Sequence, residues 1–388
     1  MYFLDFLDAK PLYYDEIDYG RMPRVWEKVR YAFTLPKIVH VVGTNGKGTT
    51  GRFLAQALRS AGHRVGHYTS PHILRFNERI WIDGAEASDA LLQQAFETVL
   101  ARLDAADAAV LSYFEFTTLM AAAAFEGCDY AVMEAGLGGE HDATAVFDKA
   151  LSLFTPIGID HQAFLGEDVE TIARTKLRAM GPEAIIGVQR HAEVCAAAEA
   201  IGREKDARLL RLHDVLDENA IIRLQKISKT LRLADYMADN LMLAAAALQR
   251  LGIAWNAASF GTPPFGRLTR IAPNVLLDVG HNVPAAEAIA AALGRRTFTL
   301  VYGSYGDKDY AGVLRALAPV VASVELIEIE AERAASQASL EAALRAAGLP
   351  FRAFDRLDEK KNYLVFGSFA VAEAFLRKTG LQVPSGEE

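Results

Sequence analysis

The stretch IVHVVGTNGKGTTG, residues 38–51, combines an apolar strand, a glycine-rich loop and the start of a helix. Glycines let backbone N–H groups turn toward an anion, and the first turn of a helix attracts negative charge. The spacing departs from the general phosphate loop, because only two residues separate Gly43 from the Gly46–Lys47 pair. An ordinary β–α turn with an exposed lysine is the alternative. We favour a phosphate-binding loop, in which Lys47 bridges phosphates and Thr49 offers its hydroxyl to Mg²⁺.

Short apolar runs alternate with helical patterns along the chain. Strands are expected first at 38–42, 130–135, 151–157 and 184–188, with helices at 49–61, 88–103 and 115–126. After WNAASFGTPPFGR, residues 255–267, strands are expected at 274–280, 297–303, 324–329 and 363–368, with helices at 284–294 and 309–322. Such alternation predicts βαβ units and mostly parallel sheets. We therefore expect an α/β fold with a P-loop ATP-binding domain over residues 1–262 and a smaller Rossmann-like domain over residues 263–388.

Composition narrows the class of protein. The 388 residues carry a net charge of −8 and are 51% hydrophobic, and no basic stripe suggests nucleic acid as a partner. The start of the chain has no basic segment typical of a secretory signal, and the longest apolar stretches are too short to span a bilayer. The two cysteines, Cys128 and Cys195, form no metal-binding motif, and a structural disulfide is not expected. We expect a soluble cytoplasmic protein with no membrane partner.

Polar residues follow several predicted strands, where the ligands of open parallel sheets bind. Ser70 lies in TSPH, Glu134 closes the apolar run YAVME, and His161 lies in IDHQAFLG. A carboxylate such as Glu134 can hold Mg²⁺, although capping of the next helix is an equal alternative. For His161 alone, a satisfied structural histidine is the simpler interpretation, and TSPH alone could be an ordinary turn. Because these segments share one predicted edge, we expect a single site.

Lys176 lies within the apolar stripe of a predicted helix, DVETIARTKLRAM, residues 168–180. A buried ammonium is costly unless it is paired, deprotonated or modified. The ordinary alternative is that the side chain reaches solvent. A neutral buried lysine can also react with CO₂ to give a carbamate, which acts as a carboxylate-like ligand.

The segments named so far, with several others, resemble the folylpolyglutamate synthase and dihydrofolate synthase family of the Mur-ligase superfamily. The resembling segments run in order from about residue 16 to 370 and include GTNGKGT, YTSPH, ERI, MEAGLGGEHDAT, GIDHQAFLG, IARTK, PFGR, DVGHN and DKD. The resemblance implies a Mur-ligase-type P-loop domain and an ATP-dependent ligase. Such enzymes phosphorylate a pterin carboxylate to an acyl phosphate, which the amine of L-glutamate then attacks. The implied acceptor is dihydropteroate, a reduced folate, or both, and the implied enzyme is a monomer.

The resemblance also implies roles for individual residues. ATP would be bound by Gly43, Thr44, Asn45, Gly46, Lys47, Gly48, Thr49, Asn240, Arg267 and Asp278. Two Mg²⁺ ions would be held by Thr49, Ser70, Glu134 and His161, with K⁺ as a further candidate cation. The catalytic residues would be Lys47, a carbamylated Lys176, and His281. The pterin would contact Ser112, Phe114, Asp142 and Ala143. The segment EIDYGRM, residues 16–22, resembles members that also accept dihydropteroate.

The chain also departs from the family pattern. Glu140 and His141 stand where Arg and a variable residue are usual, and Ala145 stands where Asn is usual. Thr175, Leu177 and Arg178 replace the usual Glu, Ala and Gly. Two alternatives follow: a Mur-type ligase with a cell-wall or peptide substrate, and a nucleotide-binding protein without ligase activity. The segments TSPH, SYFEF and DVGHN argue against the first, and the metal-site candidates with Lys176 argue against the second.

Overall fold

A computed structural model of the chain describes residues 1–11 and 18–383. It divides into two compact units. The first comprises Met1–Gly158 and Asp168–Thr262, and the second comprises Ile159–Glu167 and Pro263–Glu388. The short segment Ile159–Glu167 thus belongs to the second unit, although the chain on either side of it belongs to the first.

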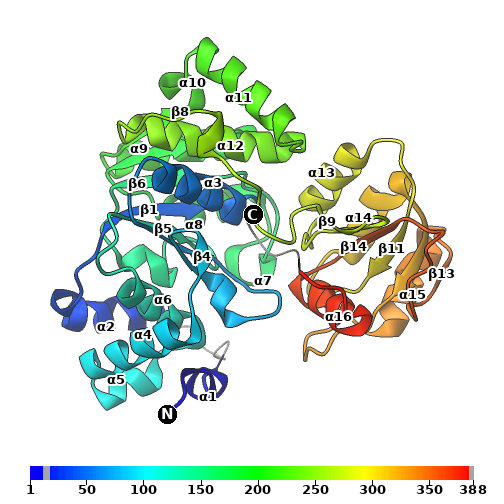
Figure 1. Ribbon diagram of the computed structural model, residues 1–388, viewed down its shortest axis with the longest axis horizontal. Helices are drawn as coiled ribbons and strands as arrows, with labels where there is room; N and C mark the ends of the chain where they lie inside the picture. Colours follow the sequence, from blue (N-terminus) through cyan, green and yellow to red (C-terminus); the bar gives the residue numbers. More distant parts are fainter. Residues whose placement is uncertain (12–17, 384–388) are drawn as a thin grey trace. The chain divides into compact units, whose positions relative to one another are not determined.

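The first unit is built on an eight-stranded sheet in the order β4-β3-β2-β5-β1-β6-β7-β8 (Figure 1). Its strands are β1 (Lys37–Val42), β2 (Val65–Tyr68), β3 (Ile80–Ile82), β4 (Ala85–Glu86), β5 (Tyr130–Glu134), β6 (Leu151–Phe154), β7 (Glu183–Ile186) and β8 (Arg208–Arg211). The strands from β2 to β8 in that order pair in parallel, whereas β3 and β4 form an antiparallel edge. The parallel sheet predicted from the alternating pattern is confirmed, and its antiparallel edge is an addition.

Helices cover both faces of this sheet (Figure 1). The helices of the first unit are α1 (Phe3–Asp8), α2 (Arg21–Val29), α3 (Lys47–Ser60), α4 (Asp89–Arg102), α5 (Ala105–Val110), α6 (Tyr113–Ala124), α8 (Val169–Leu177), α9 (Ala192–Glu204), α10 (Leu212–Val215), α11 (Glu218–Thr230) and α12 (Asp235–Arg250). Short 3₁₀ turns are η1 (Arg30–Ala32), η2 (Phe76–Arg79), η3 (Ala143–Val146) and η4 (Ala257–Ser259). Successive strand residues pack into opposite cores: Ile38 joins the core beneath α4 and α6, while Val39 joins the core beneath α3 and α12.

Strand β6 is shorter than the predicted strand at 151–157, because it ends at Phe154. Pro156 lacks a backbone N–H and cannot continue the ladder. Its carbonyl instead accepts hydrogen bonds from the N–H groups of Thr44 at 2.9 Å and Asn45 at 3.3 Å. The end of the predicted strand therefore supports the glycine-rich loop.

The second unit contains a six-stranded sheet in the order β13-β12-β11-β14-β10-β9, antiparallel only at β9. Its strands are β9 (Thr269–Ala272), β10 (Val275–Leu277), β11 (Phe298–Tyr302), β12 (Val321–Leu326), β13 (Phe351–Ala353) and β14 (Tyr363–Phe366). Its helices are α7 (Gln162–Leu165), α13 (Val283–Leu293), α14 (Tyr310–Leu317), η5 (Ala318–Val320), α15 (Gln337–Ala346) and α16 (Phe369–Thr379). The predicted helix at 309–322 is shorter than expected, because Pro319 lies in η5 and the chain enters β12 at Val321. Among the described residues, no helix is long and apolar enough to cross a bilayer.

Two histidines in the first sheet, His40 on β1 and His67 on β2, are fully buried. Burial, together with the charge of Lys149, lowers the pKa of His40 to about 3. Burial and the charge of Arg52 likewise hold the pKa of His67 well below its ordinary value. Both imidazoles are therefore neutral in the folded protein at physiological pH.

We expect acid to destabilise the first unit. Below about pH 6.5 the unfolded chain binds protons that the buried imidazoles cannot, so each histidine removes about 1.4 kcal/mol of stability per pH unit. For His40 the loss continues down to its folded pKa of about 3. Urea unfolding at pH 7, 6 and 5 can be followed by tryptophan fluorescence, because all three tryptophans lie in the first unit. In His40→Leu the free energy of unfolding should fall less steeply with decreasing pH than in the wild type. Equal slopes for the two proteins would contradict the conclusion that His40 is buried in its neutral form.

Candidate active site

The glycine-rich loop ends in helix α3, whose N-cap is Gly46 with φ at 87°. A Cβ at Gly46 would lie 2.4 Å from Oδ1 of Asn240, and a Cβ at Gly43 would lie 1.9 Å from Oγ1 of Thr155. Both positions therefore require glycine, because neighbouring side chains occupy the space of any larger residue. Asn240, predicted at the adenine, packs in this way against the loop.

Lys47 is the first residue of α3, two positions before the predicted helix start. Its Nζ lies 3.3 Å from the carbonyl oxygens of both Gly43 and Thr44 and 3.8 Å from Oε1 of Glu134. Thr44 is fixed in turn by Gly158, since its hydroxyl donates to the Gly158 carbonyl at 3.0 Å and accepts from the Gly158 N–H at 3.1 Å. The ammonium group is thus held over the loop and beside a carboxylate.

Glu134 ends β5 and is buried, with 4% of its surface exposed. Its Oε2 accepts hydrogen bonds from the Thr69 hydroxyl and, at 3.4 Å, from the Ser70 N–H. Thr49 lies buried in the first turns of α3. Carboxylate and hydroxyl oxygens are ligands that Mg²⁺ prefers, so the donor set of Glu134, Thr49 and Ser70 fits such an ion.

Lys176 lies on the buried face of α8, with 4% of its surface exposed. Its Nζ donates to the Gly43 carbonyl at 3.1 Å. A Cβ at Gly139 would lie 2.5 Å from the Lys176 carbonyl oxygen, so the loop after β5 also packs on this residue. The prediction that Lys176 is buried is confirmed, and the interpretation that it reaches solvent is wrong. Its position between the two loops fits the predicted catalytic role.

Phe114, predicted to contact the pterin, packs between two neighbours. Its ring stacks on Tyr68 with centroids 5.8 Å apart and an interplanar angle of 27°. A Cβ at Gly136 would lie 2.5 Å from the Phe114 ring, so the glycine lets the loop after β5 reach this aromatic side chain. The strand-end loop and the start of α6 therefore form one surface.

Ser112, a second pterin candidate, caps α6. Its hydroxyl accepts from the Glu115 N–H at 3.3 Å, and Glu115 Oε2 accepts from the Ser112 N–H at 2.8 Å. Nε of Arg21 also donates to Glu115 Oε2 at 2.7 Å, which ties α2 to the start of α6. Within the predicted segment 16–22, Glu16 and Ile17 lie outside the described residues.

Asp142 is buried and organises its own loop. Its Oδ2 accepts from the Leu137 N–H at 2.8 Å, and its Oδ1 accepts from the N–H of Thr144 at 3.0 Å and the hydroxyl of Thr144 at 2.5 Å. Burial raises the pKa of Asp142, while the hydrogen bonds from Thr144 and Leu137 oppose that shift. Ala143, also a pterin candidate, is buried as the first residue of η3.

Four of the residues that depart from the family pattern contact one another or the N-terminal segment: Glu140, His141, Thr175 and Arg178. Oε2 of Glu140 lies 3.6 Å from Nη1 of Arg178, and the Glu140 N–H donates to the Thr175 carbonyl at 3.0 Å. The His141 ring lies on Tyr19, with centroids 4.5 Å apart. The acid at position 140 and the base at position 178 therefore form one charge-compensated pair.

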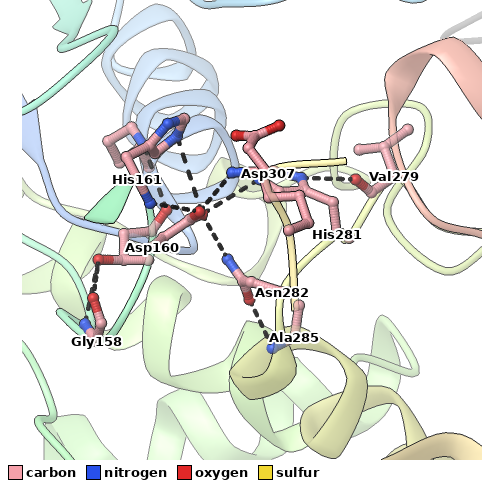
Figure 2. A network of polar contacts seen from close by, with 12 residues as sticks. Gly158, Asp160, His161, Val279, His281, Asn282, Ala285 and Asp307 are labelled. Atoms are coloured by element: carbon pink, nitrogen blue, oxygen red, sulfur yellow. Dashed lines mark hydrogen bonds and ion pairs between the residues drawn. The ribbon is translucent and has the colours of Figure 1, made fainter. Parts of the chain in front are cut away.

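In the second unit, Asp160 is the centre of a polar network (Figure 2). Its Oδ1 accepts from Lys308 Nζ at 2.5 Å, and its Oδ2 accepts from Asn282 Nδ2 at 2.9 Å. Nε2 of His281 lies 3.2 Å from the same Oδ2. Asp160, His161 and His281 have ligand atoms within 4.8 Å of one another, but the Lys308 ammonium competes with a metal ion for Asp160.

Opposing effects act on the ionisation of Asp160. Burial alone would raise the pKa of its carboxyl, but the hydrogen bond from His281 and electrostatic interactions with His281, His161 and Lys308 hold that pKa well below its usual range. The other nitrogen of His281, Nδ1, lies 3.3 Å from the Val279 carbonyl. Asp160 therefore stays ionised and fixes the orientation of the His281 ring.

Arg267 and Asp278 also lie in the second unit. The Arg267 guanidinium lies 5.4 Å from the centroid of the Phe369 ring, and its Nη1 donates to the Gly266 carbonyl at 3.3 Å. Asp278 accepts from the N–H groups of Leu268 and Gly280, each at 2.8 Å. The predicted ATP-binding roles of these two residues stay predictions.

The structure therefore brings together, within the first unit, the phosphate loop, Glu134, Ser70 and Lys176. His161 and His281 are neighbours in the second unit, with rings 6.5 Å apart. Sequence reasoning did not single out Asp160 or Lys308. Asp160 lies in GIDHQAFLG and Lys308 in DKD, but no feature of the sequence indicates that these two distant residues pair.

Comparisons with known proteins identify the family of the chain. Residues 41–248 match the model of the Mur ligase middle domain. The chain is 35% identical over 327 residues to the dihydrofolate synthase/folylpolyglutamate synthase of Escherichia coli, covering 79% of this chain and 76% of that protein.

Solved structures show the same similarity. The crystal structure of Helicobacter pylori folylpolyglutamate synthetase has a TM-score of 0.78 and 36% identity and covers 97% of both chains. The bifunctional folylpolyglutamate synthase/dihydrofolate synthase with Mn, AMPPNP and L-glutamate bound has a TM-score of 0.77 and 27% identity and covers 96% of both chains.

We expect Asp160→Asn to destabilise the second unit by about 3–5 kcal/mol, because it leaves the buried Lys308 ammonium without its counter-ion. Native-state hydrogen exchange of the β11 and β14 amides measures the opening of this unit. Asp307→Asn is the matched control, since Asp307 is more exposed and lies 3.8 Å from the partly exposed Arg333. Its effect should stay below about 1 kcal/mol, and an equal effect of the two variants would contradict the role of Asp160.

Proposed function

Because the chain belongs to the dihydrofolate synthase/folylpolyglutamate synthase family of Mur ligases, we propose that it is an ATP-dependent ligase that joins L-glutamate to a pterin carboxylate. The observation that carries this proposal is the pairing of Lys47 with Glu134, 3.8 Å apart, where the central parallel strands end. A lysine on a glycine-rich loop beside a metal-binding carboxylate is suited to phosphoryl transfer.

The reaction needs positioning and charge neutralisation more than covalent help from the protein. The γ-phosphoryl group of ATP passes to the acceptor carboxylate and gives an acyl phosphate and ADP. The amine of L-glutamate then attacks the acyl carbon, and phosphate leaves as the amide forms. Lys47 and the N–H groups at the start of α3 would hold the phosphates during the transfer.

Mg²⁺, when bound, would neutralise phosphate charge, and Glu134, Thr49 and Ser70 would hold it. The Yersinia pestis relative binds Mn and AMPPNP, which supports a divalent ion with the nucleotide. Magnesium itself, a second ion with His161 as ligand, and K⁺ are further parts of the proposal. The proposal also includes both ligation activities, with dihydropteroate and with a reduced folate, together with a monomeric state and a cytoplasmic location.

Phe114 and the loop that carries Asp142 form the proposed pterin-binding surface. The ring of Phe114 offers an aromatic surface for the heterocycle, and the loop reaches that ring at Gly136. Arg267, Asp278 and His281 are proposed ligands of ATP or of the reacting groups.

ADP release tests the function directly. With ATP, Mg²⁺ and L-glutamate, we expect release with dihydropteroate, tetrahydrofolate or both, and none when either the acceptor or glutamate is left out. Release with UDP-linked peptides but not with pterins would indicate another Mur-type ligase. No release with any acceptor would indicate a nucleotide-binding protein without ligase activity.

We expect Lys176→Ala to lose activity about 10- to 100-fold, because the two loops lose a shared charged group. Small carboxylates such as acetate should partly restore the rate by replacing the carbamate. Arg174→Ala is the control on the same helix, since Arg174 pairs with Glu170 on the exposed side. A ¹³C NMR spectrum of active wild-type enzyme in ¹³C-bicarbonate that shows no carbamate signal would contradict the carbamate.

A further inference from the structure

Three buried side chains connect β1 to the loop after β5. Nε2 of His40 lies 2.8 Å from Oγ1 of Thr144, and Oγ1 of Thr144 lies 2.5 Å from Oδ1 of Asp142. The exposed fractions of His40, Thr144 and Asp142 are 0%, 0% and 6%. The chain of hydrogen bonds continues from Oδ2 of Asp142 to the Leu137 N–H.

The hydrogen bonds fix the direction of each donor. Asp142 receives two backbone N–H groups and the Thr144 hydroxyl, an arrangement that an ionised carboxylate accepts in full. A threonine hydroxyl has one proton, and here it is given to Asp142. The His40 ring must therefore carry its proton on Nε2 and donate to Thr144. Its Nδ1 is then a buried acceptor that has no hydrogen-bond partner among the described residues.

A buried nitrogen without a hydrogen-bond partner lowers the stability of the folded protein, and the fold itself does not need such a nitrogen at this position. A leucine would fill similar space in the sheet without any polar atom to satisfy. His67 carries the same cost, so what distinguishes His40 is its hydrogen bond to Thr144. The gain here is at the other end of the chain of hydrogen bonds, where Thr144 and Asp142 shape the loop that packs on Phe114 and Lys176.

We propose that His40 is a positioning residue for acceptor binding, acting through Thr144 on Asp142 and its loop. The role rests on the proposed function, because that loop carries the proposed pterin-binding residues. His40 also lies on β1, three residues before Gly43, which follows the end of that strand. We call residues 135–142, the loop between β5 and η3, the acceptor loop. Strand β1 therefore positions two loops: the phosphate loop through its backbone, and the acceptor loop through the His40 side chain.

Two variants separate positioning from packing. His40→Gln keeps an N–H donor on a side chain of similar reach, whereas His40→Leu fills the space without a donor. For His40→Leu we expect the KM for the pterin acceptor, dihydropteroate or tetrahydrofolate according to which one supports ADP release, to rise about fivefold to tenfold, the effect of one lost hydrogen bond. The KM for ATP should stay within about twofold, and His40→Gln should remain close to wild type in both constants.

His67→Leu is the matched control. His67 is also fully buried in the same sheet, and its Nε2 also has no partner among the described residues. Its Nδ1 accepts from Arg52 and not from any residue of the acceptor loop. This variant should leave the KM for the same pterin acceptor unchanged. The inference is overturned if His40→Leu leaves that KM unchanged, if both KM values rise together, or if glutamine fails as leucine does.

A measurement without turnover separates this inference from the proposed function. The N–H groups of Leu137 and Thr144 both donate to Asp142, so their hydrogen exchange reports whether the loop is held. Exchange should be about tenfold faster in His40→Leu and unchanged in His40→Gln. If wild-type protein releases no ADP with any pterin, the proposed function fails, while these exchange rates still decide whether His40 positions the loop. Unchanged exchange in His40→Leu would overturn that role.

Discussion

The parallel pairing of β1 between β5 and β6 is the constraint on which the site of the first unit depends. Val41 lies opposite both Glu134 and Leu153, so the loops that follow the three strands leave the sheet at one edge. The glycine-rich loop must then pass close to Thr155 and Asn240. The glycines of this loop leave room for these neighbouring side chains as well as for an anion. The spacing of the loop therefore need not follow that of the general phosphate loop.

Much of the fold could be predicted because the central strands are continuous apolar runs and the helices show a clear period. The edge strands β3 and β4 were not predicted, since three- and two-residue strands give almost no periodic signal. Lys176 could be found from sequence because a charge inside an apolar stripe is visible locally. Asp160 could not, because its partner Lys308 is distant along the chain and only folding brings them together.

A single residue can have both a structural role and a functional role. Ser112 caps α6, and Asp142 caps η3, as the ordinary chemistry of these residue types predicts. Those same caps hold Phe114 and the Gly136 loop in place. Two of the departures from the family pattern also keep a structural contact. Glu140 and Arg178 compensate each other in charge, and the neighbouring Gly139 stays packed on Lys176. Such paired changes let a surface diverge while the buried support is kept.

The chain passes between its two units three times, at 158–159, 167–168 and 262–263. The second unit therefore contains a segment encoded inside the first, and that segment supplies Asp160 to Lys308. A gene fragment cut at residue 262 would yield a C-terminal piece with a buried cation and no counter-ion. Exchange of C-terminal units between relatives is constrained in the same way, since each new unit must match the nine-residue excursion, Ile159–Glu167, of its host. The second unit is therefore complete only with Ile159–Glu167, which the chain supplies from within the sequence of the first unit.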